Sequence, residues 1–350
     1  MKKLYFSIII LGALLFISSC NDEWKDELYT NMLSLKAPIN RDDVSVIYLR
    51  YQDKETNYKL PVIVSGSQIN NRDYTVNIKV DNDTLKDLNR DKYNDREDLF
   101  YRQLSPSHYE FPSQTCQIPA GSDVALFDIN FKLKGLDLVE KWVLPLTIAP
   151  DPSYTLNTYK GRQKALLWVI PFNDYSGSYS ATNMKVYFGN NTEKYMAAST
   201  REARVVDENT IFFYAGITEE LAENRGLFKV KCEFIQEKDT IIGATDIVDP
   251  ITGDTVKLKM KTGKLKLSAD NEKLALEVIG NPTYVIREES DIDRPFIVRR
   301  TYILTMEYRY EDRESSSNPD VVFPYRCTGT MSLQRDMNVI IPDEDQAILW

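Results

Sequence analysis

Apolar and polar residues alternate over short segments along most of this chain of 350 residues. In Val124–Leu133 the second half, Phe-Asp-Ile-Asn-Phe-Lys-Leu, places its apolar side chains on one face. A period of two is typical of a β-strand with one buried face. Similar patterns predict strands at Val44–Tyr51, Lys59–Ser65, Tyr74–Val80, Thr115–Pro119, Trp142–Ala149 and Lys164–Pro171. Short strands at this spacing predict an immunoglobulin-like β-sandwich over residues 38–171.

The polar segment Asn82–Pro106 interrupts these strands and is predicted to carry a helical turn around Thr84–Arg90. Inside it, Asp87–Asp98 places oxygen-bearing side chains at several positions that an EF-hand calcium loop uses. Lys92 stands where such a loop needs glycine, and Asp98 stands where it ends in glutamate. The pattern therefore favours a solvated helix and loop without a metal ion.

Longer segments with the same period of two fill residues 174–350, after a predicted boundary at Phe172-Asn173-Asp174. Lys257–Leu267 is the clearest, with Thr262-Gly263 as a predicted turn. Two similar phrases, Ser176–Ser180 and Thr328–Ser332, lie near the two ends of this half. Pairing of the first strand with the last removes exposed sheet edges. We therefore predict an all-β chain: the sandwich followed by an antiparallel, lipocalin-like β-barrel or by a second β-sandwich.

Residues 1–19 have the composition of an export signal. Lys2 and Lys3 precede an apolar run, Leu4–Phe16, that is too short to span a bilayer comfortably. The run ends in Ile17-Ser-Ser-Cys20, which resembles the lipobox of bacterial lipoproteins. An ordinary secretory peptide is the alternative. We expect cleavage before Cys20 and acylation of Cys20, so that membrane lipid holds the mature chain.

An acidic tether is predicted to follow over residues 20–37. Its first residues, Asn21–Glu27, resemble the export signal that sends Bacteroidetes-type lipoproteins to the outer face of the outer membrane. We therefore expect a lipid-anchored protein of the outer membrane that faces the cell exterior.

The charge of the chain argues against nucleic acid as a partner. Residues 1–19 carry two lysines and no acidic residue, so their removal takes the formal net charge from −9 to −11. An acidic chain repels phosphate.

Three cysteines remain once Cys20 is assigned to lipid: Cys116, Cys232 and Cys327. In an oxidising compartment they permit at most one disulfide. Cys232 with Cys327 would be that bridge, because both lie in the same predicted domain. Three buried free thiols that pack as small hydrophobic groups are an equally open alternative.

The chain lacks the usual catalytic and cofactor motifs. His108 is its single histidine, whereas the histidine-based zinc motifs need two or more. A catalytic triad is also not indicated, because no Ser or Cys nucleophile phrase accompanies His108. No glycine-rich nucleotide-binding phrase occurs. Carboxylate pairs could still form a glycoside hydrolase, but the chitinase-type DxxDxDxE phrase is absent. We therefore expect a non-enzymatic protein without cofactors.

Four phrases resemble a known family of surface proteins. Leu104–Tyr109, Cys116–Gly121 and Trp142–Ile148 resemble the N-terminal β-sandwich domain of Bacteroidetes surface lipoproteins, which also precedes the catalytic domain of some endo-β-N-acetylglucosaminidases. Tyr325–Arg335 resembles the end of the uncharacterised C-terminal domain that often follows it. The resemblance implies a role in a Sus-like polysaccharide-utilisation system. No catalytic domain follows, so hydrolase activity is not implied.

These observations lead to three hypotheses. The first is a cell-surface lipoprotein that binds an oligosaccharide and works beside a Sus-like transporter. The second is a structural, adhesive or transporter-accessory surface protein, and the third is a glycoside hydrolase. The loop aromatics available for sugar stacking are Tyr93, Tyr101, Tyr109, Tyr154, Tyr159 and Tyr284. Trp142 and Trp168 are predicted to be core residues, and no glycan-binding residue is assigned.

Overall fold

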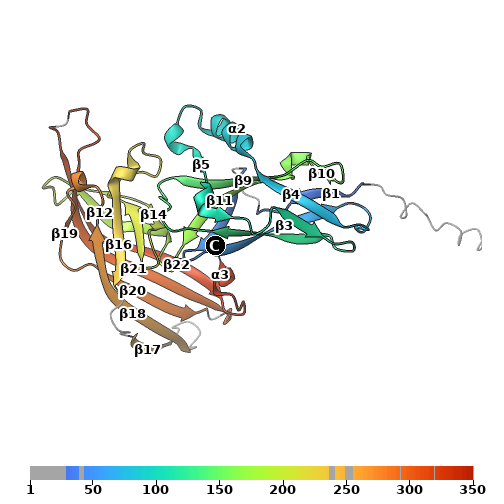
Figure 1. Cartoon of the computed structure of the whole chain (residues 1–350). Coiled ribbons are helices and arrows are strands. Elements are labelled where there is room, and N and C mark those ends of the chain that lie inside the picture. The colour runs from blue at the N-terminus through green and yellow to red at the C-terminus, as the bar shows by residue number, and fades with distance from the viewer. Residues whose placement is uncertain are drawn as a thin grey trace, which may run out of the picture.

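The computed structural model describes residues 29–38, 43–235, 241–248, 255–291, 293–318 and 320–349. Within these ranges the chain is almost entirely β-structure, as predicted. A β-sandwich and a β-barrel lie side by side, and the C-terminal end of the chain lies between them (Figure 1). None of the described helices has the length and apolarity that a membrane crossing requires.

Two sheets build the sandwich. In the part of the chain that the structure describes, one sheet has the order β10-β1-β3-β8-β6 and the other β2-β11-β9-β4-β7, with β5 paired to β9. The first sheet comprises β1 (Met32–Leu35), β3 (Thr56–Ser65), β6 (Tyr109–Glu110), β8 (Val124–Phe131) and β10 (Thr155–Leu156). The second comprises β2 (Ser45–Arg50), β4 (Tyr74–Val80), β5 (Tyr101–Gln103), β7 (Thr115–Ile118), β9 (Lys141–Ile148) and β11 (Lys164–Phe172). Their facing side chains form one apolar core.

Strand β1 lies inside the segment that the sequence analysis assigns to the tether. Leu33 and Leu35 are buried in the sandwich core, and β1 pairs antiparallel with β3. A strand of four residues is too short for a period of two to be recognised. The sandwich therefore begins before residue 38.

Helix α2 (Asn82–Tyr93) covers part of the second sheet, above β5 and β9 (Figure 1). The side chain of Asp81 caps its N-terminus by accepting from the backbone N–H of Thr84. Asn89, within the EF-hand-like phrase, is buried, and its side-chain amide makes two hydrogen bonds of 2.8 Å with the backbone of Tyr101. Across the described residues, no group of three or more His, Cys, Asp or Glu could hold a metal ion.

The C-terminal half forms a closed barrel, so the barrel alternative is confirmed over a second sandwich. Among the described residues, eight strands follow the order β12-β14-β15-β16-β18-β20-β21-β22, and β22 pairs with β12 to close the ring. These strands are β12 (Gly177–Phe188), β14 (Thr200–Val205), β15 (Thr210–Tyr214), β16 (Lys229–Ile235), β18 (Thr255–Ser268), β20 (Thr283–Ser290), β21 (Ile297–Asp312) and β22 (Phe323–Asn338). Shorter or flanking elements are β13 (Tyr195–Ala197), β17 (Ile241–Val248), β19 (Glu277–Val278), α3 (Glu344–Ala347) and β23 (Ile348–Leu349).

The two similar phrases near the ends of this half lie in β12 and β22, the strands that close the barrel, and they meet at one residue pair. Ser180 lies opposite Ser332, and Met184 lies opposite Gly329. A Cβ atom on Gly329 would stand 2.0 Å from the carbonyl oxygen of Asn183, and its φ of +139° is one that side chains rarely allow. Glycine is therefore required where the barrel closes.

The predicted turn at Thr262-Gly263 is wrong, because β18 runs through it without interruption. Gly263 lies opposite Tyr284 of β20, and the tyrosine ring occupies the space above it, 2.4 Å from where a Cβ would stand. Glycine thus makes room for an aromatic ring inside the barrel.

Aromatic side chains fill the barrel interior. The largest fully buried ones include Tyr179, Tyr284, Tyr302, Tyr308, Tyr310, Phe213 and Phe234. Tyr175 stacks on Phe234 with ring centroids 3.7 Å apart. The barrel is therefore a packed core and not a container for a large ligand.

Cys116, Cys232 and Cys327 are buried free thiols. The Cys232–Cys327 disulfide therefore does not form, and the free-thiol alternative holds. Burial raises the pKa of Cys116 to about 11 and that of Cys327 to about 12.

Candidate functional site

Most of the loop tyrosines considered for sugar stacking are not available. Tyr101, Tyr154 and Tyr284 are buried, whereas Tyr93 and Tyr109 are half-buried. Only Tyr159 among them is well exposed, at 62%. Cys20, the one residue assigned a role from sequence, lies outside the described residues, so its lipidation stays a prediction.

A cavity with a volume of about 610 Å³ lies between the sandwich and the barrel. Its strand residues come from β2, β9 and β11 of the sandwich and from β12, β14, β22 and β23 on the barrel side, and residues between strands, such as Val139, Glu220 and Arg225, complete the lining. Ligand cavities of this size commonly form at domain interfaces.

The sandwich side of the cavity is the outer face of the second sheet. Along β11, Leu167 and Val169 point into the sandwich core, whereas Trp168 and Ile170 face outward and line the cavity. Tyr48 of β2 lies beside Ile170 in the parallel register and is 42% exposed. Two aromatic side chains of this wall, Trp168 and Tyr48, therefore stand on the same face of adjacent strands.

Trp168 was predicted to be a core residue, which is only partly correct. Its ring packs edge-on against Tyr101 with centroids 5.6 Å apart, so one side of the indole is held by the sandwich. It is nevertheless only half-buried and lines the cavity. Trp142 is also half-buried and packs against the sandwich core, as expected.

The barrel side of the cavity carries the charged groups Glu202, Arg204 and Glu220. Arg204 donates to the carboxylate of Glu220 at 2.5 Å and lies over the ring of Tyr214, 5.3 Å from its centroid. Burial opposes the charge of Arg204, but the hydrogen bond and charge of Glu220 outweigh it and raise the pKa of the guanidinium. On the opposite wall, burial and then the charge of Glu202 raise the pKa of Tyr48.

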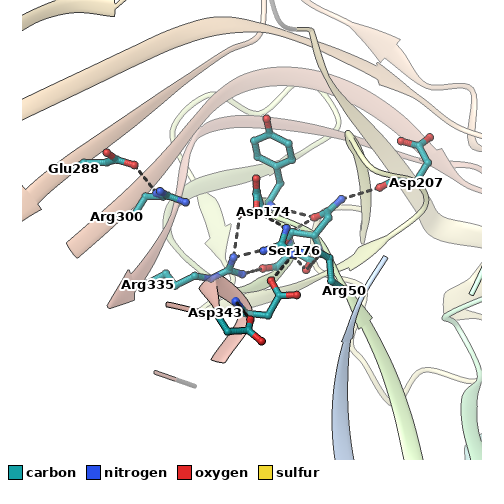
Figure 2. A network of polar contacts seen from close by, with 11 residues as sticks. Arg50, Asp174, Ser176, Asp207, Glu288, Arg300, Arg335 and Asp343 are labelled. Carbon is teal, nitrogen blue, oxygen red and sulfur yellow. Dashed lines mark hydrogen bonds and ion pairs between the residues drawn. The ribbon is translucent and has the colours of Figure 1, made fainter. Parts of the chain in front are cut away.

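One set of polar contacts at the linker sets the relative position of the two walls. Arg335 of β22, 5% exposed, donates to the backbone carbonyls of Asn173, Asp174 and Ser176, the last at 2.7 Å. Figure 2 shows Arg335 directed at this linker. Because the linker carbonyls are bound to a barrel strand, the chain between the domains cannot swing freely.

Arg50 of β2 strengthens the same junction from the sandwich side. Its guanidinium pairs with Asp174 at 2.8 Å and with Asp345 of α3, and it lies over the ring of Phe172, 5.0 Å from the centroid. The C-terminal helix is thereby held between the two domains. Phe172, Met337 and Ile348 form a small apolar cluster beside it.

A second set of contacts joins the domains on the other side of the cavity. Arg225, 5% exposed, donates from the barrel half to the backbone carbonyls of Asp98 at 2.8 Å and Val139 at 3.3 Å. Arg96 donates in the opposite direction, to the carbonyl of Leu221 at 2.9 Å. With contacts on both sides, the cavity is preformed.

His108 takes no part in this site. It is the last residue of the short 3-10 helix Pro106–His108, and its Nδ1 is 2.8 Å from the carbonyl oxygen of Lys132. His108 thus makes a local structural contact and is not part of a catalytic group.

Sequence reasoning did not identify the cavity. Its residues are spread along almost the whole described chain, from Tyr48 to Leu349. The available signal was the apolar character of both faces of Lys164–Pro171, because a strand that is apolar on both sides is covered on both sides.

Comparisons with known proteins agree with this two-part organisation. The family model "Domain of unknown function (DUF4973)" matches residues 24–152, and a model of a C-terminal domain matches residues 163–332. No curated protein matches the chain.

Several solved structures match nearly the whole chain. A multidomain protein including DUF1735 from Bacteroides ovatus is 38% identical, with a TM-score of 0.76, and the match covers 91% of this chain and 99% of that one. A protein of unknown function from the same species is 39% identical over 91% and 100% of the two chains, with a TM-score of 0.77. An auxiliary nutrient binding protein from Bacteroides thetaiotaomicron is 30% identical over 89% and 97%, with a TM-score of 0.73.

Proposed function

Because this chain belongs to the family of two-domain proteins that these Bacteroides structures represent, with DUF4973 in the N-terminal half, we propose that it is a non-catalytic, glycan-binding lipoprotein of a nutrient-uptake system. The cavity between the sandwich and the barrel is the proposed binding site. The description of the 30% identical relative as an auxiliary nutrient binding protein supports this role.

The observation that carries the proposal is the pairing of aromatic and polar groups in one preformed cavity. Trp168 and Tyr48 offer apolar ring surface on one wall, and Glu202, Arg204 and Glu220 offer hydrogen-bonding groups on the other. A sugar ring needs both, because its C–H face stacks on aromatic rings and its hydroxyls bond to polar side chains. A volume of about 610 Å³ is suited to a short oligosaccharide segment.

The carboxylates of the cavity favour binding over hydrolysis. Glycosidases of the common type use two carboxyl groups that flank the scissile bond. Here the carboxylate of Glu220 is paired with Arg204 at 2.5 Å, and the carboxylate of Glu140 is paired with Arg102 at 3.0 Å. A single carboxylate, Glu202, remains among the described acidic residues that line the cavity.

A glycan array and affinity electrophoresis with the purified chain test this proposal. We expect retardation by at least one polysaccharide of host or plant origin. Tyr48→Ala should weaken that binding about tenfold, equivalent to about 1.4 kcal/mol, because it removes a stacking surface. Tyr159→Ala is the matched control, since Tyr159 is an exposed tyrosine that does not line the cavity. Absence of glycan binding, or equal effects of both substitutions, would contradict the proposal.

A lipid anchor at Cys20 is also proposed. Acylated Cys20 would hold the protein on the outer membrane, with the binding cavity facing the cell exterior and close to a Sus-like transporter. Metabolic labelling with an alkyne-bearing fatty acid tests it: the full chain should incorporate the label and a Cys20→Ala chain should not.

A transporter-accessory role is the second candidate function, favoured by an open sheet edge. All three residues of β13, Tyr195, Met196 and Ala197, are exposed, and β13 pairs with β12 alone among the described strands. Exposed strand edges are sites for pairing with another chain. Co-purification with an outer-membrane transporter, lost on Met196→Pro but retained by Tyr48→Ala, would support this role.

A further inference from the structure

The four cations that line the cavity are directed at protein acceptors. Arg225 and Arg335 bind backbone carbonyls, and Arg204 binds Glu220. The ammonium group of Lys141 lies 3.0 Å from the hydroxyl of Tyr93 and 3.3 Å from the carbonyl oxygen of Leu99. It also lies over the rings of Tyr93 and Tyr101, at 4.7 Å and 5.3 Å from their centroids. These donors are therefore already used in holding the fold together.

Glu202 of β14 differs from the other carboxylates of the cavity. Among the described residues, its carboxylate makes no hydrogen bond and no ion pair, whereas Glu140 and Glu220 are each paired with an arginine. Glu202 lies opposite Ser178 in the sheet, so both occupy the barrel surface that faces the sandwich. Glu202 and Tyr48 line the same cavity from its two walls, and after burial the charge of Glu202 is the second cause of the raised pKa of Tyr48.

We propose that the ligand of this cavity is an uncharged oligosaccharide, with hydroxyls on one sugar bonded to the carboxylate of Glu202 and its ring stacked on Tyr48 or Trp168. The inference rests on the proposed function and adds the substrate class. A carboxylate has only acceptors, so it matches hydroxyl groups, which donate. Two adjacent hydroxyls can satisfy its two oxygens together.

An anionic glycan does not fit the same arrangement. A uronic acid or a sulfate needs a cation with donors directed at it, and the donors of the four cations are directed at the protein. It would also have to approach the carboxylate of Glu202 in a partly desolvated space, where repulsion between like charges is strong. The cavity therefore discriminates by charge as well as by shape.

The test compares three sets of hexasaccharides with the purified full chain in titration calorimetry: neutral xylo-, manno- and cello-oligosaccharides, anionic oligogalacturonates, and cationic chitosan oligomers. We expect binding by a neutral set only, with an affinity that changes little between low and high salt. Glu202→Gln should weaken that binding about tenfold, because a bond to a charged acceptor is replaced by a neutral one.

Glu233→Gln is the matched control. Glu233 is a carboxylate on barrel strand β16, which is separated from β14 by β15; it is paired with Lys266 at 3.3 Å and does not line the cavity. This substitution should leave the affinity unchanged, and thermal melts should show that both variants fold.

The outcomes separate this inference from the function on which it rests. Tighter binding of the oligogalacturonate or of the chitosan oligomer, abolished by Tyr48→Ala, would overturn the inference and leave the glycan-binding role in place. Unchanged neutral binding by Glu202→Gln would overturn it as well. If no glycan of any class binds, both proposals fail.

Discussion

The guanidinium of Arg225, in the barrel half, donates a hydrogen bond of 2.8 Å to the backbone carbonyl of Asp98, in the sandwich half. The same group reaches the carbonyl of Val139 at 3.3 Å and lies 3.6 Å from the carboxylate of Asp98. Because the Arg225 side chain is only 6% exposed, these contacts are shielded from water. Arg225 thus makes several of the contacts that hold the second junction between the domains.

Replacing Arg225 should destabilise the protein measurably. Arg225→Met introduces an unbranched side chain and removes the donor to the partly buried carbonyl groups of Asp98, Val139 and Ala222, so we expect a loss of about 2 kcal/mol in the free energy of unfolding. Urea unfolding followed by tryptophan fluorescence measures it. Arg309→Met is the control, because Arg309 is 56% exposed and its pair with Glu277 should contribute less than about 1 kcal/mol. Equal losses would show that the junction adds no stability.

Gly329 should not tolerate a side chain. Gly329→Ala places a Cβ 2.0 Å from the carbonyl oxygen of Asn183, in the pair of strands that closes the barrel. We expect a loss of about 3 kcal/mol or failure to accumulate as folded protein. Gly280→Ala provides the comparison, since its φ of +68° is also left-handed but no atom lies within 4 Å. Its expected cost is that of the backbone strain alone, about 1 kcal/mol. A Gly329→Ala chain as stable as Gly280→Ala would contradict the tight closure.

Two buried tyrosines should respond in opposite ways to loss of the hydroxyl. The hydroxyl of Tyr179 donates to the carbonyl of Tyr175 at 2.7 Å, so Tyr179→Phe should cost about 1 kcal/mol. The hydroxyl of Tyr284 is buried and has no hydrogen-bond partner among the described residues. Tyr284→Phe removes a polar group that cannot bond, so it should be neutral or stabilising. Thermal melts of both variants test this, and a stability loss in Tyr284→Phe would refute the packing described for the barrel interior.

The free thiols should be inert in the native protein. Burial raises the pKa of Cys116 to about 11 and that of Cys327 to about 12, and it also raises the pKa of Cys232. At pH 8 Ellman's reagent should therefore react with these thiols only after denaturation.

The same pKa shifts make stability depend on pH in the alkaline range. The native state holds the thiol protons more tightly than the unfolded chain does, so the stabilisation is fully present below the ordinary thiol pKa of about 8.5. It is lost as the pH rises through the raised pKa values of the folded protein. Cys327→Ser should flatten this alkaline decline, and an unchanged pH profile of stability would argue against a buried thiol at this position.

Much of the fold follows from local pattern. Strands such as Tyr74–Val80 begin and end where the alternation predicts them. A period of two in β-branched and aromatic residues places all the apolar side chains on one face of a strand, and that face is the one that becomes buried. Met32–Leu35 was missed because its pairing with β3 depends on a distant segment. Thr262-Gly263 was taken for a turn because the local sequence does not reveal the ring of Tyr284 that needs the space.

The sequence by itself determined that this chain is all-β, and the similar phrases at Ser176–Ser180 and Thr328–Ser332 indicated closure, because the periodicity of side chains is a property of each strand alone. Only the tertiary structure decided where the cavity forms. Strand β11 is apolar on both faces, and nothing in its sequence distinguishes Leu167, which enters the sandwich core, from Trp168, which lines the cavity. That distinction arises because the barrel docks beside one face of the sheet, through Arg225 and Arg335, and leaves a space that no local pattern encodes.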